Sequence, residues 1–433
     1  MRRSSVAGNA HVRDREPRSC ASGAESGCGL WGATTGPRPG SPSASRARPL
    51  GDAWGCGRFR VPASPMNAAH RPLQLAFDLS HHAWATGDQT APAQTLQSAH
   101  AADEAGIDAI WASEDPEGWD AFALLGALAT VTTHCQLGTS VTSPWPRNPN
   151  LLAASVATLD QISGGRAVLG LGRGQVEWHR DALGVQTGSP LTALRETITL
   201  LRSWWQPPHR ASSPPDSHFH IGDWERSTGP LHLPPIYVAA AGPHTLGLAG
   251  ELADGVIFNV LTSESALRQS IPLVRKAALA AGRDPDALAV ILRTEVTVTG
   301  DDVSERKALS RARSVFALLA ALPGMSRLYQ VPGHDTAAII SRVRAAMHTE
   351  EVLASGGGFP ALRRAGDLAT ARAAIPDAYI RSLALVGSIE DLAPRLAVLR
   401  DLGVTCVSVA PPADAGSLAA WQQTLTRLRA ISG

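Results

Sequence analysis

Between residues 73 and 410, short apolar runs alternate with longer segments whose apolar residues recur at helical spacing. The runs are rich in aliphatic and β-branched residues and predict eight strands, at 73–79, 107–111, 136–142, 167–172, 236–240, 255–259, 288–297 and 404–410. Apolar residues three or four positions apart predict helices between them, among others at 94–105, 119–132, 190–205, 243–253 and 265–281. Strands that alternate with helices at short spacing predict a parallel sheet.

The segment 136–174 is the clearest strand–helix–strand unit. Prolines at 144, 146 and 149 prevent regular pairing and predict an irregular loop after the first strand. Asn150 is expected to cap the helix, and Gly164 and Gly165 are expected to end it. The buried stripe of this helix is expected to consist of Leu152, Val156, Leu159 and Ile162. Near the other end of the chain, Ser388 and Asp391 form a capping-box pattern before the last predicted helix.

Eight such units within roughly 340 residues fit an α/β fold of the TIM type, a (β/α)8 barrel. The main alternative is an open, doubly wound sheet. Two insertions are predicted, at 207–234, which includes a strand-like stretch at 217–222, and at 302–376, which is mostly helical. We expect both insertions to shape the substrate pocket of a barrel domain that spans 71–433.

Residues 1–70 have a different composition, rich in Arg, Ser, Gly and Pro. This segment has too little apolar surface to offset chain entropy, so a disordered N-terminal extension is expected. The chain has 37 Arg and only two Lys, as GC-rich coding produces, and such coding readily yields spurious upstream reading frames. Two interpretations therefore stay open: a genuine disordered tail, or a true start at Met66, just before the first strand.

Charge and cysteine content exclude several classes of protein. Residues 1–70 carry ten Arg against four acidic residues, a net charge of +6, so the remainder carries about −5 of the total of +1. A mildly acidic body does not indicate a nucleic-acid groove. No apolar run reaches the roughly 18 residues that a membrane helix needs. The five Cys form no CxxC pair, which argues against a zinc site or a disulfide framework, and the His and carboxylate spacing suggests no metal site. A cytoplasmic protein is expected.

The loops after the predicted strands are the candidate functional segments, because parallel barrels carry their chemistry at the carboxyl ends of strands. The stretch 170–174 has three glycines, but Gln175 breaks the dinucleotide pattern G-x-G-x-x-G, so tight packing is an equal interpretation. In the stretch 240–245, small residues precede Pro243 at a helix start, whose free N–H groups suit an anion. An ordinary helix entry is the alternative there. Arg173 could contact a phosphate or lie in solvent.

Aromatic and ionisable residues also gather in these loops. Trp84, Trp119, Trp145 and Trp178 suit a flat ring ligand, although a single Trp usually serves packing. Glu114 and Asp115 could exchange protons, although neighbouring exposed carboxylates are usually only solvated charges. His81 and His82 follow the first strand and are open to the same two interpretations. The sequence contains neither a Ser-His-Asp signature nor HExxH.

Three stretches resemble the luciferase-like monooxygenase superfamily, in particular its branch that binds the deazaflavin coenzyme F-420. They are GTSVTSPWPRNPNLLAASVATLDQISGGRAVLGLGRG (138–174), IYVAAAGPHTLGLAGELADGVIFN (236–259) and LALVGSIEDLAPRLAVLRDLGV (383–404). The resemblance covers roughly residues 73–410 and implies the TIM-type barrel. It further implies a flavin or deazaflavin across the barrel mouth and, since relatives are often dimers, a homodimer as one candidate state.

The resemblance also implies roles for residues. A non-prolyl cis peptide is expected at Ser140–Val141, beside the ring, and the loop 241–243 is expected to hold the cofactor phosphate. The candidate cofactor contacts are Asp78, Thr139, Ser140, Val141, Arg173, Gly174, Gln175, Trp178, Ala241, Gly242 and Pro243. The candidate catalytic residues are Glu114, Asp115 and Trp119, and no metal ligand is expected.

The sequence departs from the sugar-phosphate dehydrogenases of this branch, which resemble SDHxxxW after the second strand. Here Glu114 replaces the Asp and Asp115 replaces the catalytic His, while Trp119 stays in register. Gln175 stands where those enzymes have an acidic residue, and it cannot take a proton. Sugar-phosphate oxidation is therefore not expected. Asp115 could carry a proton if burial raised its pKa.

Three functions follow as hypotheses. The first is hydride transfer, dependent on coenzyme F-420 (8-hydroxy-5-deazaflavin), to or from a small organic substrate, with Glu114 or Asp115 assisting proton transfer. The second is an FMN-dependent monooxygenase that inserts oxygen from O2. The third is a non-catalytic barrel that only binds, because the catalytic positions are substituted. The sequence does not identify the substrate.

Overall fold

The computed structural model describes residues 72–79, 91–114, 118–320, 322, 324–411 and 417–432. The predicted extension 1–70 and the alternative start at Met66 lie outside the described residues. So do Asp115, His81, His82 and Trp84.

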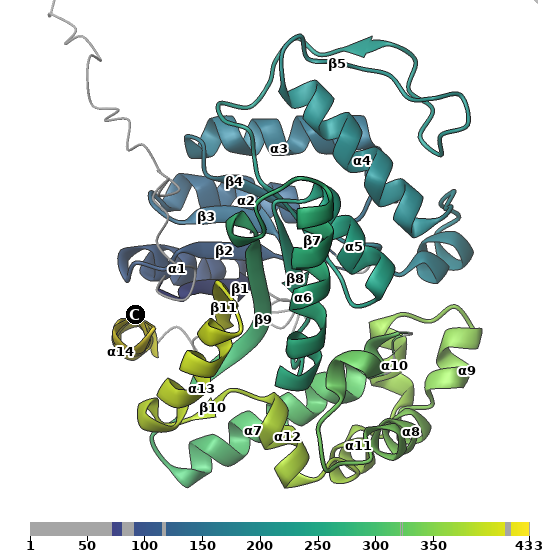
Figure 1. Cartoon of the computed structure of the whole chain (residues 1–433). Helices are drawn as coiled ribbons and strands as arrows, with labels where there is room; N and C mark the ends of the chain where they lie inside the picture. Colours follow the sequence, from purple (N-terminus) through teal and green to yellow (C-terminus); the bar gives the residue numbers. More distant parts are fainter. Residues whose placement is uncertain are drawn as a thin grey trace, which may run out of the picture. The chain divides into compact units, whose positions relative to one another are not determined.

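Eight parallel strands form a closed ring at the centre of the described chain (Figure 1). In order around the ring they are β1 (Gln74–Leu79), β2 (Ala109–Ala112), β3 (Gln136–Thr139), β4 (Ala167–Leu171), β7 (Ile236–Ala239), β8 (Gly255–Phe258), β9 (Ala289–Val298) and β11 (Cys406–Val409). The ring closes because β9 pairs with both β8 and β11, and β11 pairs with β1. The predicted (β/α)8 barrel is confirmed, and the open doubly wound sheet is wrong.

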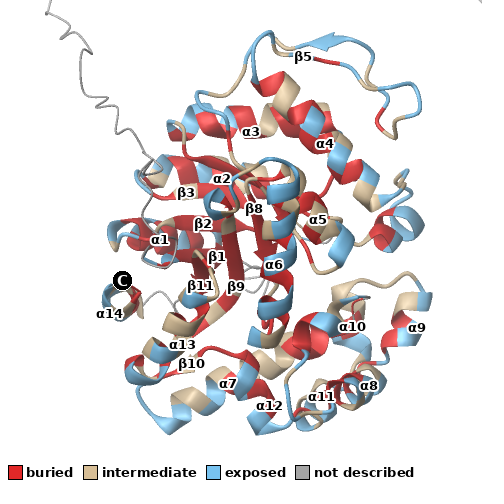
Figure 2. Ribbon diagram, viewed as in Figure 1, coloured by how far each residue is buried: buried red, intermediate tan, exposed pale blue. Residues whose placement is uncertain are grey.

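Helices surround this ring, and the main core lies between them and the strands, which are almost wholly buried (Figure 2). The surrounding helices are α1 (Ala91–Glu104), α2 (Ala121–Val131), α3 (Pro149–Ser163), α4 (Pro190–Trp205), α5 (Pro243–Leu252), α6 (Glu264–Ala280), α13 (Ile389–Asp401) and α14 (Leu418–Ile431). A smaller apolar cluster, which includes Trp111, Val168 and Ile291, fills the interior of the barrel. No helix among the described residues combines the length and the apolarity that crossing a membrane requires.

The insertion after β9 folds as a group of helices with its own core, seen together in Figure 1. Its core includes Phe316, whose ring contacts the rings of both Tyr329 and Tyr379. Its elements are α7 (Asp302–Leu319), the short turn η5 (Met325–Tyr329), α8 (Thr336–Ala346), α9 (Thr349–Ala354), α10 (Phe359–Ala365), α11 (Leu368–Ala373) and α12 (Asp377–Leu383). The predicted mostly helical insertion is confirmed, and it continues through α12.

Several local predictions were wrong. The strand expected at 217–222 is absent; the excursion instead pairs β5 (Arg210–Ala211) with β6 (Trp224–Glu225). The cap of α3 is Asn148, whose side chain accepts from the N–H of Asn150, because Pro149 already occupies the first helical turn. Ile162 is 53% exposed, since it lies on the solvent side of the last turn of α3. The sequence patterns also did not reveal α14 or the short strand β10 (Val386–Gly387).

Other local predictions are confirmed. Gly164 ends α3 in the left-handed conformation, with φ of 72°. Ser388 and Asp391 form the capping box at the start of α13. The apolar residues Leu194, Ile198 and Leu201 of α4 are buried, as its spacing predicts. These elements follow from local sequence because their caps and stripes act within a few residues.

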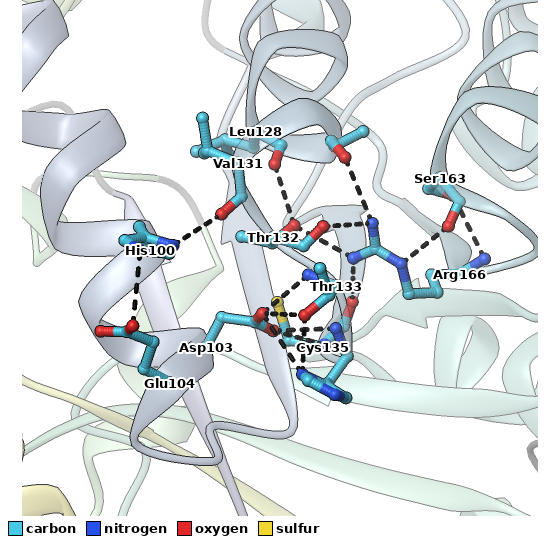
Figure 3. A network of polar contacts seen from close by, with 12 residues as sticks. His100, Asp103, Glu104, Leu128, Val131, Thr132, Thr133, Cys135, Ser163 and Arg166 are labelled. Carbon is cyan, nitrogen blue, oxygen red and sulfur yellow. Dashed lines mark hydrogen bonds and ion pairs between the residues drawn. The ribbon is translucent and has the colours of Figure 1, made fainter. Parts of the chain in front are cut away.

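A polar network fixes the entry of β3 (Figure 3). The carboxylate of Asp103, on α1, accepts from the backbone N–H groups of Thr133 at 2.7 Å, His134 at 3.0 Å and Cys135 at 2.8 Å. Burial alone would raise the pKa of Asp103, but these backbone hydrogen bonds hold it well below its ordinary value. The buried guanidinium of Arg166 donates to the carbonyls of Thr132 and Cys135. The network ties α1, β3 and the start of β4 together, and the site loops follow β3 and β4.

Candidate active site

A cavity of about 570 Å³ lies at the carboxyl ends of the barrel strands. One side of it is formed by the ends of β1, β2, β3, β4, β7, β8, β9 and β11, and the other by residues of the insertion. The lining residues from the insertion are mostly apolar and include Val315, Leu318, Leu319, Leu322, Met325 and Phe359. The segment 302–376, which was expected to shape the substrate pocket, thus contributes to the lining of this cavity. Among the described residues of 207–234, by contrast, none lines this cavity.

The wall formed by the β3 and β4 loops depends on close backbone approach. The peptide bond between Ser140 and Val141 is cis, as the resemblance implies. A Cβ atom on Gly172 would stand 2.6 Å from Cγ2 of Val141, so only glycine lets these two loops pack together. Gly174 has φ of 63°, and a Cβ there would meet the side chain of Ser143 at 2.9 Å. The three glycines of the 170–174 stretch therefore serve close packing at the cavity wall.

The amino end of α5 presents backbone N–H groups at the cavity. Gly242 occupies the N-cap without a side-chain hydrogen bond, and Pro243 follows as the first helical residue. Gly242 and Thr245 line the cavity. The nearest atom to a Cβ built on Gly242 is Nη1 of Arg327, at 3.4 Å, so a guanidinium of η5 lies beside this helix start. Helix N–H groups and an adjacent arginine together favour an anion such as a phosphate.

A buried ion pair lies across the floor of the cavity. Nε of Arg293, on β9, donates to Oδ2 of Asp78, on β1, at 2.7 Å. Nη2 of Arg293 donates to Oγ of Ser113 at 2.9 Å, and that hydroxyl donates to the carbonyl of Ser140 at 2.9 Å. The second oxygen of Asp78 is buried and has no hydrogen-bond partner among the residues that the structure describes. A buried acceptor without a hydrogen bond costs free energy. This oxygen is therefore a candidate acceptor for a hydrogen bond from a bound ligand.

Glu114 is held as a structural carboxylate. It accepts from Nε of Arg147 at 2.8 Å and from the hydroxyl of Thr142, and Arg147 also pairs with Asp120. These charge-assisted contacts hold the side chain of Glu114 in one place beside the β3 loop. Its place at the cavity is consistent with orienting the β3 loop, to which Thr142 belongs.

The structure brings most of the predicted site residues together. Eight of them line the cavity, namely Asp78, Glu114, Val141, Arg173, Gly174, Gln175, Ala241 and Gly242. Thr139, Ser140 and Pro243 do not line the cavity, although Ser140 and Pro243 are next in sequence to the lining residues Val141 and Gly242. Trp119 is 56% exposed and is not a lining residue, and Trp178 is buried with its ring edge-on to Phe359 at 5.2 Å. Trp145 is buried and donates to the carbonyl of Arg173 at 2.6 Å.

Sequence reasoning missed several lining residues. Arg293 and Glu295 alternate on the carboxyl half of β9, within a predicted strand. Two charges on alternate positions of a barrel strand were the available signal, because such positions face the interior. Arg327, Phe359 and Arg363 come from the insertion and carried no recognisable motif. Their place at the cavity results from how the insertion folds back over the barrel.

Comparison with known proteins adds family relationships to this geometry. Residues 75–406 match the sequence model of a family described as luciferase-like monooxygenase. The chain is 30% identical over 312 residues to a 5,10-methylenetetrahydromethanopterin reductase of Methanolobus tindarius, covering 72% of this chain and 88% of the relative. It is 32% identical over 230 residues to an F-420-dependent glucose-6-phosphate dehydrogenase of Kineococcus radiotolerans, covering 49% and 64%.

Solved structures share the fold at lower identity. A coenzyme F-420-dependent tetrahydromethanopterin reductase from Methanopyrus kandleri superposes with a TM-score of 0.65 and 22% identity, covering 83% of this chain and 97% of that one. The oxygenating constituent of 3,6-diketocamphane monooxygenase from Pseudomonas putida, in complex with FMN, has a TM-score of 0.58 and 18% identity, covering 82% and 96%. Both likenesses concern the barrel fold.

Proposed function

Since this chain belongs to the luciferase-like monooxygenase family of oxidoreductases, we propose that it uses coenzyme F-420 for hydride transfer to or from a small organic substrate. Membership makes the protein an enzyme and removes the hypothesis of a non-catalytic barrel. The observation that carries the proposal is the cavity itself, where the amino end of α5, a close-packed glycine wall and a buried carboxylate oxygen of Asp78 meet at one barrel mouth. A relative at 32% identity that is named as an F-420-dependent dehydrogenase supports the deazaflavin over FMN.

The residues present fit a phosphate-bearing deazaflavin. Gly242, the N–H groups of the first turn of α5 and Arg327 would hold the phosphate. The loops at Val141 and Gly172 pack closely because Gly172 has no side chain. The wall that these two loops form would lie against the ring. The free oxygen of Asp78 would accept a hydrogen bond from the bound ligand. The bound deazaflavin supplies two-electron hydride chemistry.

The chain contributes orientation and exclusion of water. The leucines and Phe359 of the insertion cover the cavity with apolar surface, which strengthens every polar contact beneath them. Arg293 keeps Asp78 and Ser113 fixed, so the floor of the cavity is preorganised. The hydrogen bond from Arg147 would keep Glu114 in place beside the bound ligand.

A spectral titration with oxidised and reduced deazaflavin tests the proposal. We expect saturable binding of the deazaflavin at micromolar concentration or below, and binding of FMN at least tenfold weaker. Bound at 100 times its Kd, the deazaflavin should also stabilise the protein by about 2.7 kcal/mol. Tight binding of FMN without binding of the deazaflavin would contradict the proposal. Oxygen consumption with reduced FMN would then favour the monooxygenase.

A further inference from the structure

Glu295 lies at the carboxyl half of β9 and lines the cavity, with 21% of its side chain exposed. It alternates with Arg293, so both side chains are on the interior side of the strand, whereas Thr294 between them lines a different, smaller pocket. Its carboxylate accepts from Nη2 of Arg311, on α7, at 3.1 Å. The carboxyl group of Glu295 therefore lies at the edge of the cavity where the barrel meets the insertion.

Among the described residues, three carboxyl groups line the cavity, and their partners differ. Both oxygens of Glu114 are engaged, by Arg147 and Thr142. Asp78 pairs with Arg293, whose side chain is 15% exposed. Glu295 has its contact with Arg311, whose side chain is 39% exposed and so is partly screened by solvent. Of the three groups, Glu295 is the one whose arginine partner is most exposed to solvent, since Arg147 and Arg293 are only 13% and 15% exposed.

The face of α7 that carries Arg311 continues as the apolar wall of the cavity. Val315 lies four positions after Arg311, and Leu318 and Leu319 lie three and four positions after Val315; the last three line the cavity. Glu295 thus stands at the polar end of an otherwise aliphatic surface. A ligand with an apolar body on this wall and one polar oxygen at its end would place that oxygen beside Glu295.

We propose that Glu295 is the proton-transferring residue of this enzyme, and that its substrate is an uncharged carbonyl compound or the corresponding alcohol, whose apolar body packs on α7. The proposal rests on the proposed function. In the direction of reduction, the carbonyl carbon gains a hydride from the reduced deazaflavin, which is oxidised. The carbonyl oxygen gains the proton of the Glu295 carboxyl group, which becomes a carboxylate and recovers its proton from solvent. Alcohol oxidation reverses both transfers.

The electrostatic surroundings are consistent with this role. Burial raises the pKa of Glu295 above its ordinary value; Arg311 on α7 lowers it, Asp78 on β1 raises it further, and Arg293 on β9 lowers it. The net direction is upward, which keeps a fraction of the carboxyl groups protonated at a pH where an exposed glutamate is ionised. A general acid works best when its pKa approaches the working pH.

The test compares Glu295→Gln with the wild-type enzyme, using 2-octanone and acetophenone for reduction and their secondary alcohols for oxidation. Glutamine keeps the shape and the acceptor for Arg311 but has no proton to exchange. We expect kcat to fall by roughly 100-fold or more. As the pH rises through the pKa of Glu295, the wild-type rate of reduction should fall and the wild-type rate of oxidation should rise. These two limbs of the pH–rate profiles should both be absent in Glu295→Gln. Arg311→Met removes a cation that lowers the pKa of Glu295, so it should move both limbs to higher pH. If Glu295 had only a structural role, this substitution would not shift the pH–rate profiles.

The matched control is Glu251→Gln, an exposed glutamate of α5 that pairs with Arg195 away from the cavity. Glu251→Gln should have the same turnover rates and the same pH–rate profiles as the wild-type enzyme. The Kd for the deazaflavin and the urea midpoint should be the same in both variants within about twofold, since a misfolded Glu295→Gln would lose them. Glu295→Asp, which keeps a titratable group, should retain a pH limb.

Infrared titration of the protein without cofactor gives a readout that does not depend on turnover. The wild-type protein and Glu251→Gln should show a protonated-carboxyl band that persists above the pH at which ordinary glutamates ionise, and Glu295→Gln should lack it. Absence of deazaflavin binding would refute the proposed function whatever the band shows. Binding without turnover of any probe would overturn the substrate class. Turnover that survives in Glu295→Gln, or a pH limb lost in Asp115→Asn instead, would overturn the role of Glu295.

Discussion

At the scale of single residues, β3 and β4 can pack together only because Gly170 has no side chain. A Cβ on Gly170 would stand 2.0 Å from the carbonyl oxygen of Thr139. The hydroxyl of Thr139 donates to the carbonyl of Gly170 at 2.7 Å and accepts from its N–H at 3.1 Å. These contacts require the two strands to approach more closely than any side chain would allow, and the site loops begin just beyond them.

Gly170→Ala is therefore expected to destabilise the protein by about 3 kcal/mol or more, because backbone atoms have no room to move aside. The matched control is Gly126→Ala in the interior of α2, where a Cβ meets nothing within 4 Å. There, alanine should stabilise the protein by roughly 0.5–1 kcal/mol. Urea midpoints check both changes, and equal midpoints for the two variants would refute the close-approach argument.

The carboxylate of Asp103 gives a pH prediction. Its folded pKa lies below its unfolded value of about 3.9, so its contribution to stability is present above that value and is lost as the pH falls. Asp103→Asn should cost roughly 2 kcal/mol at pH 7, because three backbone N–H groups lose an ionised acceptor. In urea unfolding, the difference from wild type should shrink below pH 4. The exposed pair residue Asp181 serves as control, since Asp181→Asn should change little.

At the scale of elements, the candidate phosphate site is made from two parts of the chain, the start of α5 and the turn η5. Neither part is sufficient: a helix start offers N–H groups, and the insertion adds the charge of Arg327. This division explains why the sequence pattern at 240–245 predicted a candidate anion site without its arginine.

Arg327→Gln is expected to raise the Kd for the deazaflavin by roughly tenfold, the loss of one charge-assisted contact. For the dephosphorylated deazaflavin, the same substitution should leave the Kd unchanged. The control is Arg268→Gln, an exposed arginine of α6 that pairs with Glu264. Equal losses for the two forms of the cofactor would show that Arg327 does not contact the phosphate.

At the scale of the whole molecule, the first and last parts of the described chain complete the barrel together. β11 pairs with β1, the N–H of Leu73 donates to the carbonyl of Ser432, and α14 covers β1. The ring of Trp421, on α14, meets that of Phe77 with centroids 5.0 Å apart. Its Nε1 donates to the carbonyl of Ala410 at 2.9 Å, just after β11. Closure thus depends on a helix that follows the last strand.

Trp421→Ala should destabilise the protein by about 3–5 kcal/mol, because a large buried ring leaves a cavity at the closure. Trp224→Ala, at a tryptophan that is 56% exposed on β6, should cost far less. Thermal unfolding with and without deazaflavin checks both variants. If the two substitutions lowered the melting temperature by similar amounts, barrel closure would not depend on Trp421.

The sequence predicted the strands of the ring to within a few residues, and eight of the candidate site residues line one cavity. These successes have a common cause, since a parallel barrel places every strand end at the same mouth. Of the described tryptophans, Trp119 and Trp178 do not line the cavity, because a loop pattern does not say which way a side chain points: Trp119 is 56% exposed, and Trp178 is buried against Phe359. Asp115 lies outside the described residues, so its role stays a prediction.

By itself, the sequence determined the alternation of strands and helices, the helix ends at Gly164 and Ser388, and the barrel mouth as the place for chemistry. Periodicity, caps and turns act over a few residues, so they can be recognised without coordinates. Only the tertiary structure decided that Arg327 lies at the start of α5, that Arg293 binds Asp78, and that Glu295 meets Arg311 at an apolar wall. Such contacts join segments far apart in the chain, and they exist because ring closure and the packing of the insertion bring those segments together.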